Sequence, residues 1–326
     1  MIGSLRRLSA TLLGLATLAG ACSSGGDPPE GTAEPTRLEV MVASYDVVVD
    51  QANRFIVGLL ATRGEEQRFV SFGTVAFRFA YRGTAHEPVD EPFGDPVEAS
   101  FLPVFGTPER APDGGGPIRT LPSEGRGVYA AYDLSFDRPG FYEVEATAEI
   151  EEVGTMRGTG AFEVRAEPRY PAPGDEAIAS RNPTLGSGHR PEAVDSRAQG
   201  GQAIPDPELH GTTIARALRE GIPALVIFST PVFCVSQFCG PVTDMVQGFA
   251  ERYGDRAAFI HVEVWNDHDA NAVNEAAADW LLREGGISEP WLFLIGADGT
   301  IVQRWDNLFT EEEIVPLLED LPPLPD

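Results

Sequence analysis

The chain has two kinds of hydrophobic patterning, and the pattern changes after residue 166. In the segment 37–166, apolar side chains alternate with polar or small ones, most regularly at 74–82 and 128–136. A period of two predicts half-buried β-strands. Further runs of this kind lie at 37–43, 52–61, 97–106, 142–150 and 156–166. These runs predict about seven strands and an antiparallel β-sandwich.

The segment 137–140 reads Asp-Arg-Pro-Gly and predicts a hairpin turn between the runs at 128–136 and 142–150. Residues 167–205 are dense in Pro, Gly, Ser, Arg and Asp and have no apolar period. This composition predicts a partly extended linker between two domains.

From residue 206 to 322 the pattern becomes a mixture of helical periods and short apolar runs. A helical segment ends before Gly221, a residue that suits the position just past a helix end. Strands are then expected at 224–229, 257–265, 291–295 and 301–305, and helices at 241–253, 270–284 and 310–321. The order strand, helix, strand, helix, strand, strand, helix predicts an α/β domain whose central strands are buried on both faces.

Charge narrows the range of partners. The 326 residues include 50 Asp and Glu against 24 basic residues, all of them Arg, so the formal net charge is −26. Such a chain repels phosphate backbones, and no basic patch interrupts the acidic surplus. We therefore expect no nucleic-acid partner.

The first residues predict the compartment. Arg6 and Arg7 precede an apolar run at 8–21, which is too short to span a bilayer comfortably and reads as a signal peptide. The run ends Leu-Ala-Gly-Ala before Cys22, which resembles a bacterial lipoprotein signal. The resemblance implies cleavage of 1–21, lipidation of Cys22, a flexible tether at 22–36, and anchoring to a bacterial membrane outside the cytoplasm. The alternative is an ordinary secretory signal with a chance cysteine.

That compartment changes how the other cysteines are interpreted. Outside the cytoplasm thiols meet oxidants. With Cys22 lipidated, Cys234 and Cys239 are the two cysteines left, and they can pair only with each other or with a partner.

The arrangement around the pair resembles the thioredoxin fold. A strand ending at 226–228 is followed by a loop, the two cysteines and a helix, and Glu289-Pro290 later leads into a hairpin. The resemblance implies that Cys234 is the attacking thiol, that Cys239 resolves the intermediate, and that Pro290 is cis and lies against the pair. In the preceding part of the chain, the segment 137–144 is similar to bacterial immunoglobulin-like modules, which implies a spacer or partner-binding module.

The spacing of the pair is C-x4-C rather than the C-x-x-C of thioredoxins. In one regular helix, five residues would separate the two positions by about 7.5 Å along the axis, whereas disulfide-linked Cα atoms usually lie within roughly 7 Å. Either Cys234 lies in a loop before a helix that starts at Pro241, or a helical turn unwinds on oxidation. The second behaviour is implied by a resemblance to Q-type peroxiredoxins, although Thr230 is one residue further from Cys234 than in that family.

We therefore expect an extracytoplasmic, membrane-anchored thiol-disulfide oxidoreductase that acts on protein thiols or disulfides and needs no cofactor. The alternatives are a binding or scaffold lipoprotein with a structural disulfide, and a thiol peroxidase. Glu289 would either oppose thiolate formation by its charge or shuttle a proton to the resolving thiol.

A copper site is the alternative chemistry that two cysteines and a histidine could supply. Copper chaperones of the Sco family use two cysteines and a distant histidine, for which His261 and His268 are the candidates. Neither histidine has metal-ligand spacing to the cysteines. We therefore expect His261 to be a structural residue of its strand and expect no metal.

Overall fold

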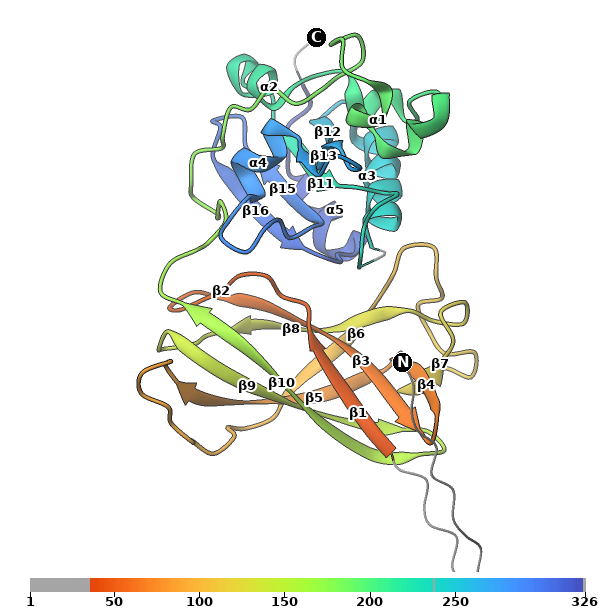
Figure 1. Cartoon of the computed structure of the whole chain (residues 1–326), viewed down its shortest axis with the longest axis vertical. Helices are drawn as coiled ribbons and strands as arrows, with labels where there is room; N and C mark the ends of the chain where they lie inside the picture. Colours follow the sequence, from red (N-terminus) through yellow and green to blue (C-terminus); the bar gives the residue numbers. More distant parts are fainter. Residues whose placement is uncertain (1–35, 237, 325–326) are drawn as a thin grey trace, which may run out of the picture. The chain divides into compact units, whose positions relative to one another are not determined.

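The computed structural model describes residues 36–236 and 238–324. The predicted signal peptide 1–21, Cys22 and all but the last residue of the tether 22–36 lie outside the described residues. Within the described ranges, no helix is long and apolar enough to cross a membrane. The described chain comprises a β-rich N-terminal part and a smaller mixed α/β region (Figure 1).

The β-rich part is a large, curled, mixed sheet. Its strands are β1 (Thr36–Val42), β2 (Val47–Val48), β3 (Asn53–Arg63), β4 (Glu66–Ser71), β5 (Thr74–Gly83), β6 (Val97–Pro103), β7 (Ile118–Thr120), β8 (Gly127–Leu134), β9 (Gly140–Ile150) and β10 (Gly154–Arg165). The order is β2-β10-β9-β5-β6-β8-β3-β4-β7, with β1 paired to β3. The curl brings β10 close to β1, and a Cβ at Gly158 would collide with the Leu38 carbonyl. Gly158 therefore permits this close approach.

All seven strands expected from the alternation are present, and the short strands β2, β4 and β7 are additional. The antiparallel β-sandwich predicted from these runs is corrected by the hydrogen bonding, which joins the strands into one continuous curled sheet and pairs β2 with β10 in parallel. The hairpin predicted at 137–140 is wrong. The edges of β8 are occupied by β3 and β6, so β9 pairs with β5 and β10 instead.

The α/β region contains a four-stranded sheet with helices around it. Its elements are α2 (Ile214–Glu220), β11 (Ala224–Ser229), α3 (Cys239–Tyr253), β12 (Ala258–Glu263), β13 (Trp265–Asp267), β14 (Ala272–Val273), α4 (Glu275–Leu281), β15 (Trp291–Ile295), β16 (Ile301–Asp306) and α5 (Glu311–Glu319). The sheet order is β12-β11-β15-β16, with β11 parallel to β12 and antiparallel to β15.

The predicted order of strands and helices in this region is confirmed. Gly221 has a φ of 65° and caps α2 through its N–H, as the sequence indicated. The helix expected at 270–284 is shorter, because the small hairpin β13–β14 takes up its first residues and Asn274 caps α4.

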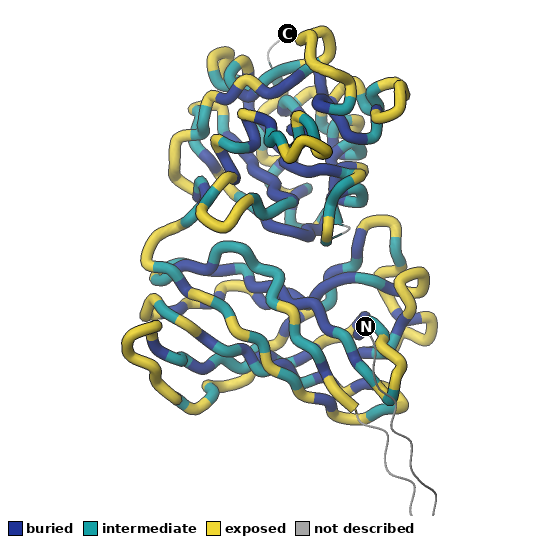
Figure 2. The backbone as a smooth tube through the Cα atoms, in the orientation of Figure 1, coloured by how far each residue is buried: buried dark blue, intermediate teal, exposed yellow. Residues whose placement is uncertain are grey.

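The segment expected to be a linker contributes buried residues and short helices. These helices are α1 (Pro191–Val194), η1 (Ser196–Gly201) and, just beyond it, η2 (Pro207–His210). Tyr170, Val194 and Asp195 are buried. Figure 2 shows buried stretches of backbone in both the β-rich part and the α/β region. The segment 167–205 is therefore packed rather than extended for much of its length.

One apolar cluster contains residues of both parts of the chain. Ile56, Leu102 and Val128 of the curled sheet are in the same buried cluster as Leu225 and Leu308 of the α/β region. In β3, neighbours of Ile56 such as Phe55 and Val57 belong instead to the core of the curled sheet. The alternation of β3 thus supplies two cores, one on each face.

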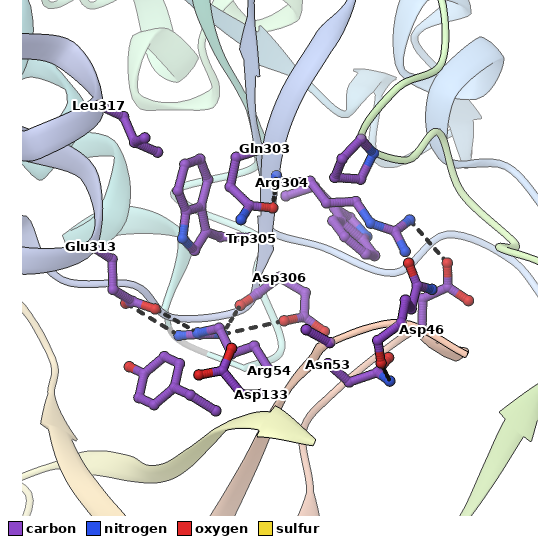
Figure 3. A pocket seen from close by; sticks show the side chains of 15 residues that line it. Asp46, Asn53, Arg54, Asp133, Gln303, Arg304, Trp305, Asp306, Glu313 and Leu317 are labelled. Atoms are coloured by element: carbon purple, nitrogen blue, oxygen red, sulfur yellow. Dashed lines mark hydrogen bonds and ion pairs between the residues drawn. The ribbon is translucent and has the colours of Figure 1, made fainter. Parts of the chain in front are cut away.

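Ion pairs accompany this cluster (Figure 3). Arg54 of β3 has a side chain only 14% exposed, and its Nε lies 2.7 Å from Glu313 Oε1. Arg304 of β16 pairs with Asp46 at 2.9 Å. The four residues of these ion pairs line a pocket together with Tyr132. Because the charged groups satisfy one another, we assign this pocket a structural role.

Shortening Ile56 is expected to destabilise the α/β region as well as the sheet. All four tryptophans lie at positions 265–305 of the α/β region, whereas Ile56 lies in β3 and is fully buried. Ile56→Ala should lower the free energy of unfolding by about 2–5 kcal/mol. The tryptophan fluorescence transition in urea should shift to lower denaturant accordingly. Val302→Ala, at an exposed position, is the control, and an unchanged tryptophan transition in Ile56→Ala would contradict the shared core.

Candidate redox site

Cys234 and Cys239 form a disulfide whose Cα atoms are 6.0 Å apart. Cys239 is the first residue of α3, and Cys234 lies in the loop that follows β11. In the disulfide-bonded protein Cys234 therefore lies in a loop before the helix, which begins two residues earlier than the predicted Pro241. Unwinding of a helical turn on oxidation stays a prediction. Gln237, between the cysteines, lies outside the described residues.

The two sulfurs have different environments. Cys239 is fully buried, whereas Cys234 is partly exposed. The Ser236 hydroxyl lies 3.2 Å from Cys234 Sγ. Among the residues that the structure describes, no side chain caps the N-terminus of α3, and the first turn of this helix carries no acidic residue. The partial positive charge of that helix end therefore remains available to stabilise a thiolate.

The carboxyl group of Glu289 lies beside the disulfide. One of its oxygens and the two sulfurs all lie within 4.8 Å of one another. Glu289 Oε2 is buried and has no hydrogen-bond partner among the described residues. Burial, together with the negative charge of Glu263, raises the pKa of Glu289 to about 8. The group is therefore protonated at neutral pH, and the charge that the sequence led us to expect there develops only at higher pH.

Glu263 is a second buried acid at this end of the sheet. It is 1% exposed and ends β12. Its Oε2 accepts the Ser196 N–H at 2.8 Å, and its Oε1 accepts the Trp265 N–H at 3.2 Å. Burial raises the pKa of Glu263, and the nearby His261 opposes that shift. The sequence signal for Glu263 is a single charged residue at the end of an apolar strand, which our sequence analysis did not use.

The peptide bond between Glu289 and Pro290 is cis, as the thioredoxin resemblance implied. Pro290 is buried and directly precedes β15. The Tyr45 hydroxyl, from the loop after β1, donates a hydrogen bond of 2.6 Å to the Glu289 carbonyl. It also lies 2.8 Å from Asn307 Oδ1. Tyr45 thus links the N-terminal part of the chain to the backbone that carries Glu289, and the sequence pattern did not single it out.

Apolar side chains flank Cys234 on the surface. Val232 is 41% exposed and Val235 is 96% exposed. Between them, Phe233 stacks on the ring of His268, with ring centroids 3.9 Å apart. Of the two histidines considered for copper, His268 is therefore held against this loop, and His261 lies in β12.

No protein-family model matches this chain, and no curated protein is significantly similar to it in sequence. The geometry of the site is therefore the basis for proposing a function.

The raised pKa of Glu289 predicts that the protein loses stability as the pH rises. An unfolded glutamate ionises at a pH of about 4.3, whereas folded Glu289 keeps its proton up to about 8. Between these values the folded state binds more protons, so the free energy of unfolding decreases with increasing pH. The stability of wild type relative to Glu289→Gln, from urea denaturation without reductant, should therefore be greatest below about pH 4 and decline through pH 8.

The matched control is Glu284→Gln, because Glu284 is exposed and close in sequence. The difference in the free energy of unfolding between wild type and Glu284→Gln should not decline as the pH rises. A pH-independent difference for Glu289→Gln would mean that Glu289 ionises alike in the folded and unfolded states.

Proposed function

We propose that this protein is an extracytoplasmic thiol-disulfide oxidoreductase anchored to a bacterial membrane through a lipid on Cys22. The observation that carries the proposal is the disulfide between partly exposed Cys234 and buried Cys239, beside a carboxyl group with a raised pKa. Perturbed carboxyl groups next to a nucleophile are typical of active sites.

The surrounding fold supports a thioredoxin-like assignment for the α/β region. A mixed four-stranded sheet, a cysteine pair between β11 and α3, and a cis proline before β15 are all present. We assign the β-rich part the role of a spacer between the membrane anchor and the redox site. Its described residues contain no cysteine.

In the reduced protein, Cys234 thiolate attacks one sulfur of a partner disulfide. The partner S–S bond breaks, a mixed disulfide forms, and the first partner sulfur leaves as a thiolate. Cys239 thiolate then attacks Cys234 Sγ, which closes the intramolecular disulfide and releases the second partner thiolate. The partner gains two electrons and, after protonation, two thiols, and the protein loses two electrons. The reverse sequence oxidises a partner dithiol.

Glu289 is assigned the proton transfer that these steps require. Cys239 is fully buried, and burial in apolar surroundings disfavours its thiolate. An ionised Glu289 takes the proton of Cys239 before the second attack, and a protonated Glu289 returns it when the disulfide opens. A pKa of about 8 is close to that of a free thiol, so the transfer in either direction is nearly balanced.

The partner is assigned as a protein. Val232 and Val235 place apolar surface next to Cys234, and such surface suits an unfolded or extended polypeptide better than a small charged thiol. The net charge of −26 disfavours anionic partners such as nucleic acid.

The first test is capture of a mixed disulfide. Cys239→Ser removes the resolving thiol, so a complex with a protein substrate should accumulate, whereas Cys234→Ser leaves only a buried thiol and should capture nothing. Insulin is the probe, and the complex is measured by non-reducing electrophoresis and mass spectrometry. Wild type should also reduce insulin with dithiothreitol as electron donor.

Two outcomes favour the other functions. Failure of both capture and insulin reduction would leave a structural disulfide in a scaffold lipoprotein. Conversion of Cys234 to sulfenic acid by hydrogen peroxide, without insulin reduction, would identify a thiol peroxidase.

The second test separates the charge of Glu289 from its proton transfer. At pH 7, Glu289→Gln should slow insulin reduction by about 10²-fold, a typical contribution of a general acid or base. In a Cys239→Ser background, the same substitution should speed iodoacetamide alkylation of Cys234 mainly above about pH 8, where Glu289 becomes charged. Glu284→Gln is again the control. Unchanged exchange and alkylation would show that Glu289 takes no part.

A further inference from the structure

A second cluster of polar side chains lies inside the α/β region, apart from the cysteines. Asp195 follows α1, His210 ends η2, and His261 lies in β12. All three side chains are 0% exposed. One ligand atom from each residue lies within 4.8 Å of the other two. Three segments far apart in the sequence therefore place two imidazoles and one carboxylate at a single point.

The ring nitrogens in this cluster lack ordinary hydrogen bonds. His210 Nδ1, His210 Nε2 and His261 Nδ1 are buried and have no hydrogen-bond partner among the described residues. A buried polar atom without a partner costs about 1–3 kcal/mol. Two of these atoms, His210 Nε2 and His261 Nδ1, face the same oxygen of Asp195, and this arrangement is expected only if something else lies between them.

The tautomer of His261 indicates what that occupant is. His261 Nε2 lies 3.2 Å from the Ser229 carbonyl oxygen. A carbonyl only accepts hydrogen bonds, so Nε2 carries the hydrogen and Nδ1 of the neutral ring presents a lone pair. That lone pair faces Asp195 Oδ2 at 3.3 Å. Two electron-rich atoms at this distance repel each other unless a cation, either a proton or a metal ion, lies between them.

The distances fit a metal ion. Asp195 Oδ2 is 3.3 Å from His261 Nδ1 and 3.4 Å from His210 Nε2. Ligand atoms about 2.1 Å from a tetrahedral zinc ion lie about 3.4 Å from one another. The hydrogen bond from the far nitrogen of His261 to a backbone carbonyl is also the usual device that orients a zinc-binding histidine.

Arg197 and the carboxylates that it contacts carry a net negative charge. The Arg197 guanidinium bonds to Asp195 through Nε and Nη2, at 3.0 Å and 2.7 Å. It also pairs with Asp206 at 2.7 Å and Asp244 at 3.3 Å. One guanidinium and three carboxylates have a formal charge of −2, which a divalent cation neutralises. The Arg197 fork occupies one side of the Asp195 carboxylate and leaves a lone pair of Oδ2 directed at the histidines.

We propose that Asp195, His210 and His261 bind one buried zinc ion through three protein ligands, with a water molecule as the fourth ligand. The ion holds the segment that carries Asp195 and the turn that carries His210 against β12. Because all three ligands are fully buried, the site admits no substrate. It is independent of the proposed redox reaction, which uses the sulfurs and Glu289.

The test measures zinc in the full chain, produced with zinc in the medium and purified with its disulfide intact. Elemental mass spectrometry should find about one zinc ion per chain. Replacement of zinc by Co²⁺ should give the visible spectrum of a tetrahedral nitrogen and oxygen site, without a sulfur-to-cobalt charge-transfer band. Removal of the ion with a chelator should lower the unfolding temperature, because the metal binds the folded state.

Variants assign the ligands. His210→Gln and His261→Gln should each weaken zinc binding at least about tenfold. His189→Gln and His268→Gln, at histidines outside the cluster, should retain the ion, as should the Cys234→Ser, Cys239→Ser double variant. If a cluster variant fails to fold, the amount of zinc in the wild-type protein and its cobalt spectrum still test whether the cluster binds a metal ion.

Three results would overturn the proposal. They are wild type with less than about a tenth of an equivalent of zinc, full retention of zinc in both cluster variants, and a charge-transfer band that shows thiolate ligands. The first of these would mean that a proton, and not a metal ion, lies between His261 and Asp195.

Discussion

The pairing of β11 with both of its neighbours brings the loop that carries Cys234 to the same end of the sheet as Glu289. Register places Ser229 opposite Glu263 of β12 and Phe228 opposite Trp291 of β15. The end of β11 therefore meets the end of one strand and the start of another. The cysteine loop leaves the sheet at the point where Glu289 and Pro290 enter it. A slip of one residue would turn these side chains to the other face.

The same geometry creates an electrostatic conflict at this edge. Two acids, Glu263 and Glu289, are removed from water next to a disulfide, and the pKa of each is raised mainly by burial. The N-terminus of α3 favours negative charge by about 0.3–1 kcal/mol. A shift of one pKa unit corresponds to about 1.4 kcal/mol, and the pKa of Glu289 is raised by more than one unit, to about 8. Desolvation at Glu289 therefore outweighs the helix, and the carboxyl group is neutral at neutral pH while the helix end can still act on Cys234.

Local patterns in the sequence were enough to predict much of the fold. The alternating runs predicted the longer strands of the curled sheet, and Gly221 marked the end of α2. The short strands β2, β4 and β7 escaped detection, because two to six residues give too few periods for a pattern. The continuity of the sheet and the partners of β9 depend on which strand edges are already paired, and no local pattern contains that information.

The parts of the candidate redox site that are close together in the sequence could also be predicted. The cysteine pair lies next to the start of a helix in the sequence, and the proline directly precedes the apolar run that forms β15. The contribution of Tyr45 could not be predicted, since its hydroxyl meets a carbonyl 244 residues away. The pKa of Glu289 likewise depends on burial and on Glu263, which comes from a different strand. The cluster of Asp195, His210 and His261 could not be predicted either, because its three residues come from segments far apart in the sequence.

Glu263 connects the two clusters of buried groups. Its Oε2 holds the backbone N–H of Ser196, the residue after Asp195, and its charge contributes to the raised pKa of Glu289. An ionised Glu263 makes ionisation of Glu289 less favourable. Glu263 therefore contacts the segment that carries Asp195 through a hydrogen bond and influences the carboxyl group beside the disulfide through its charge.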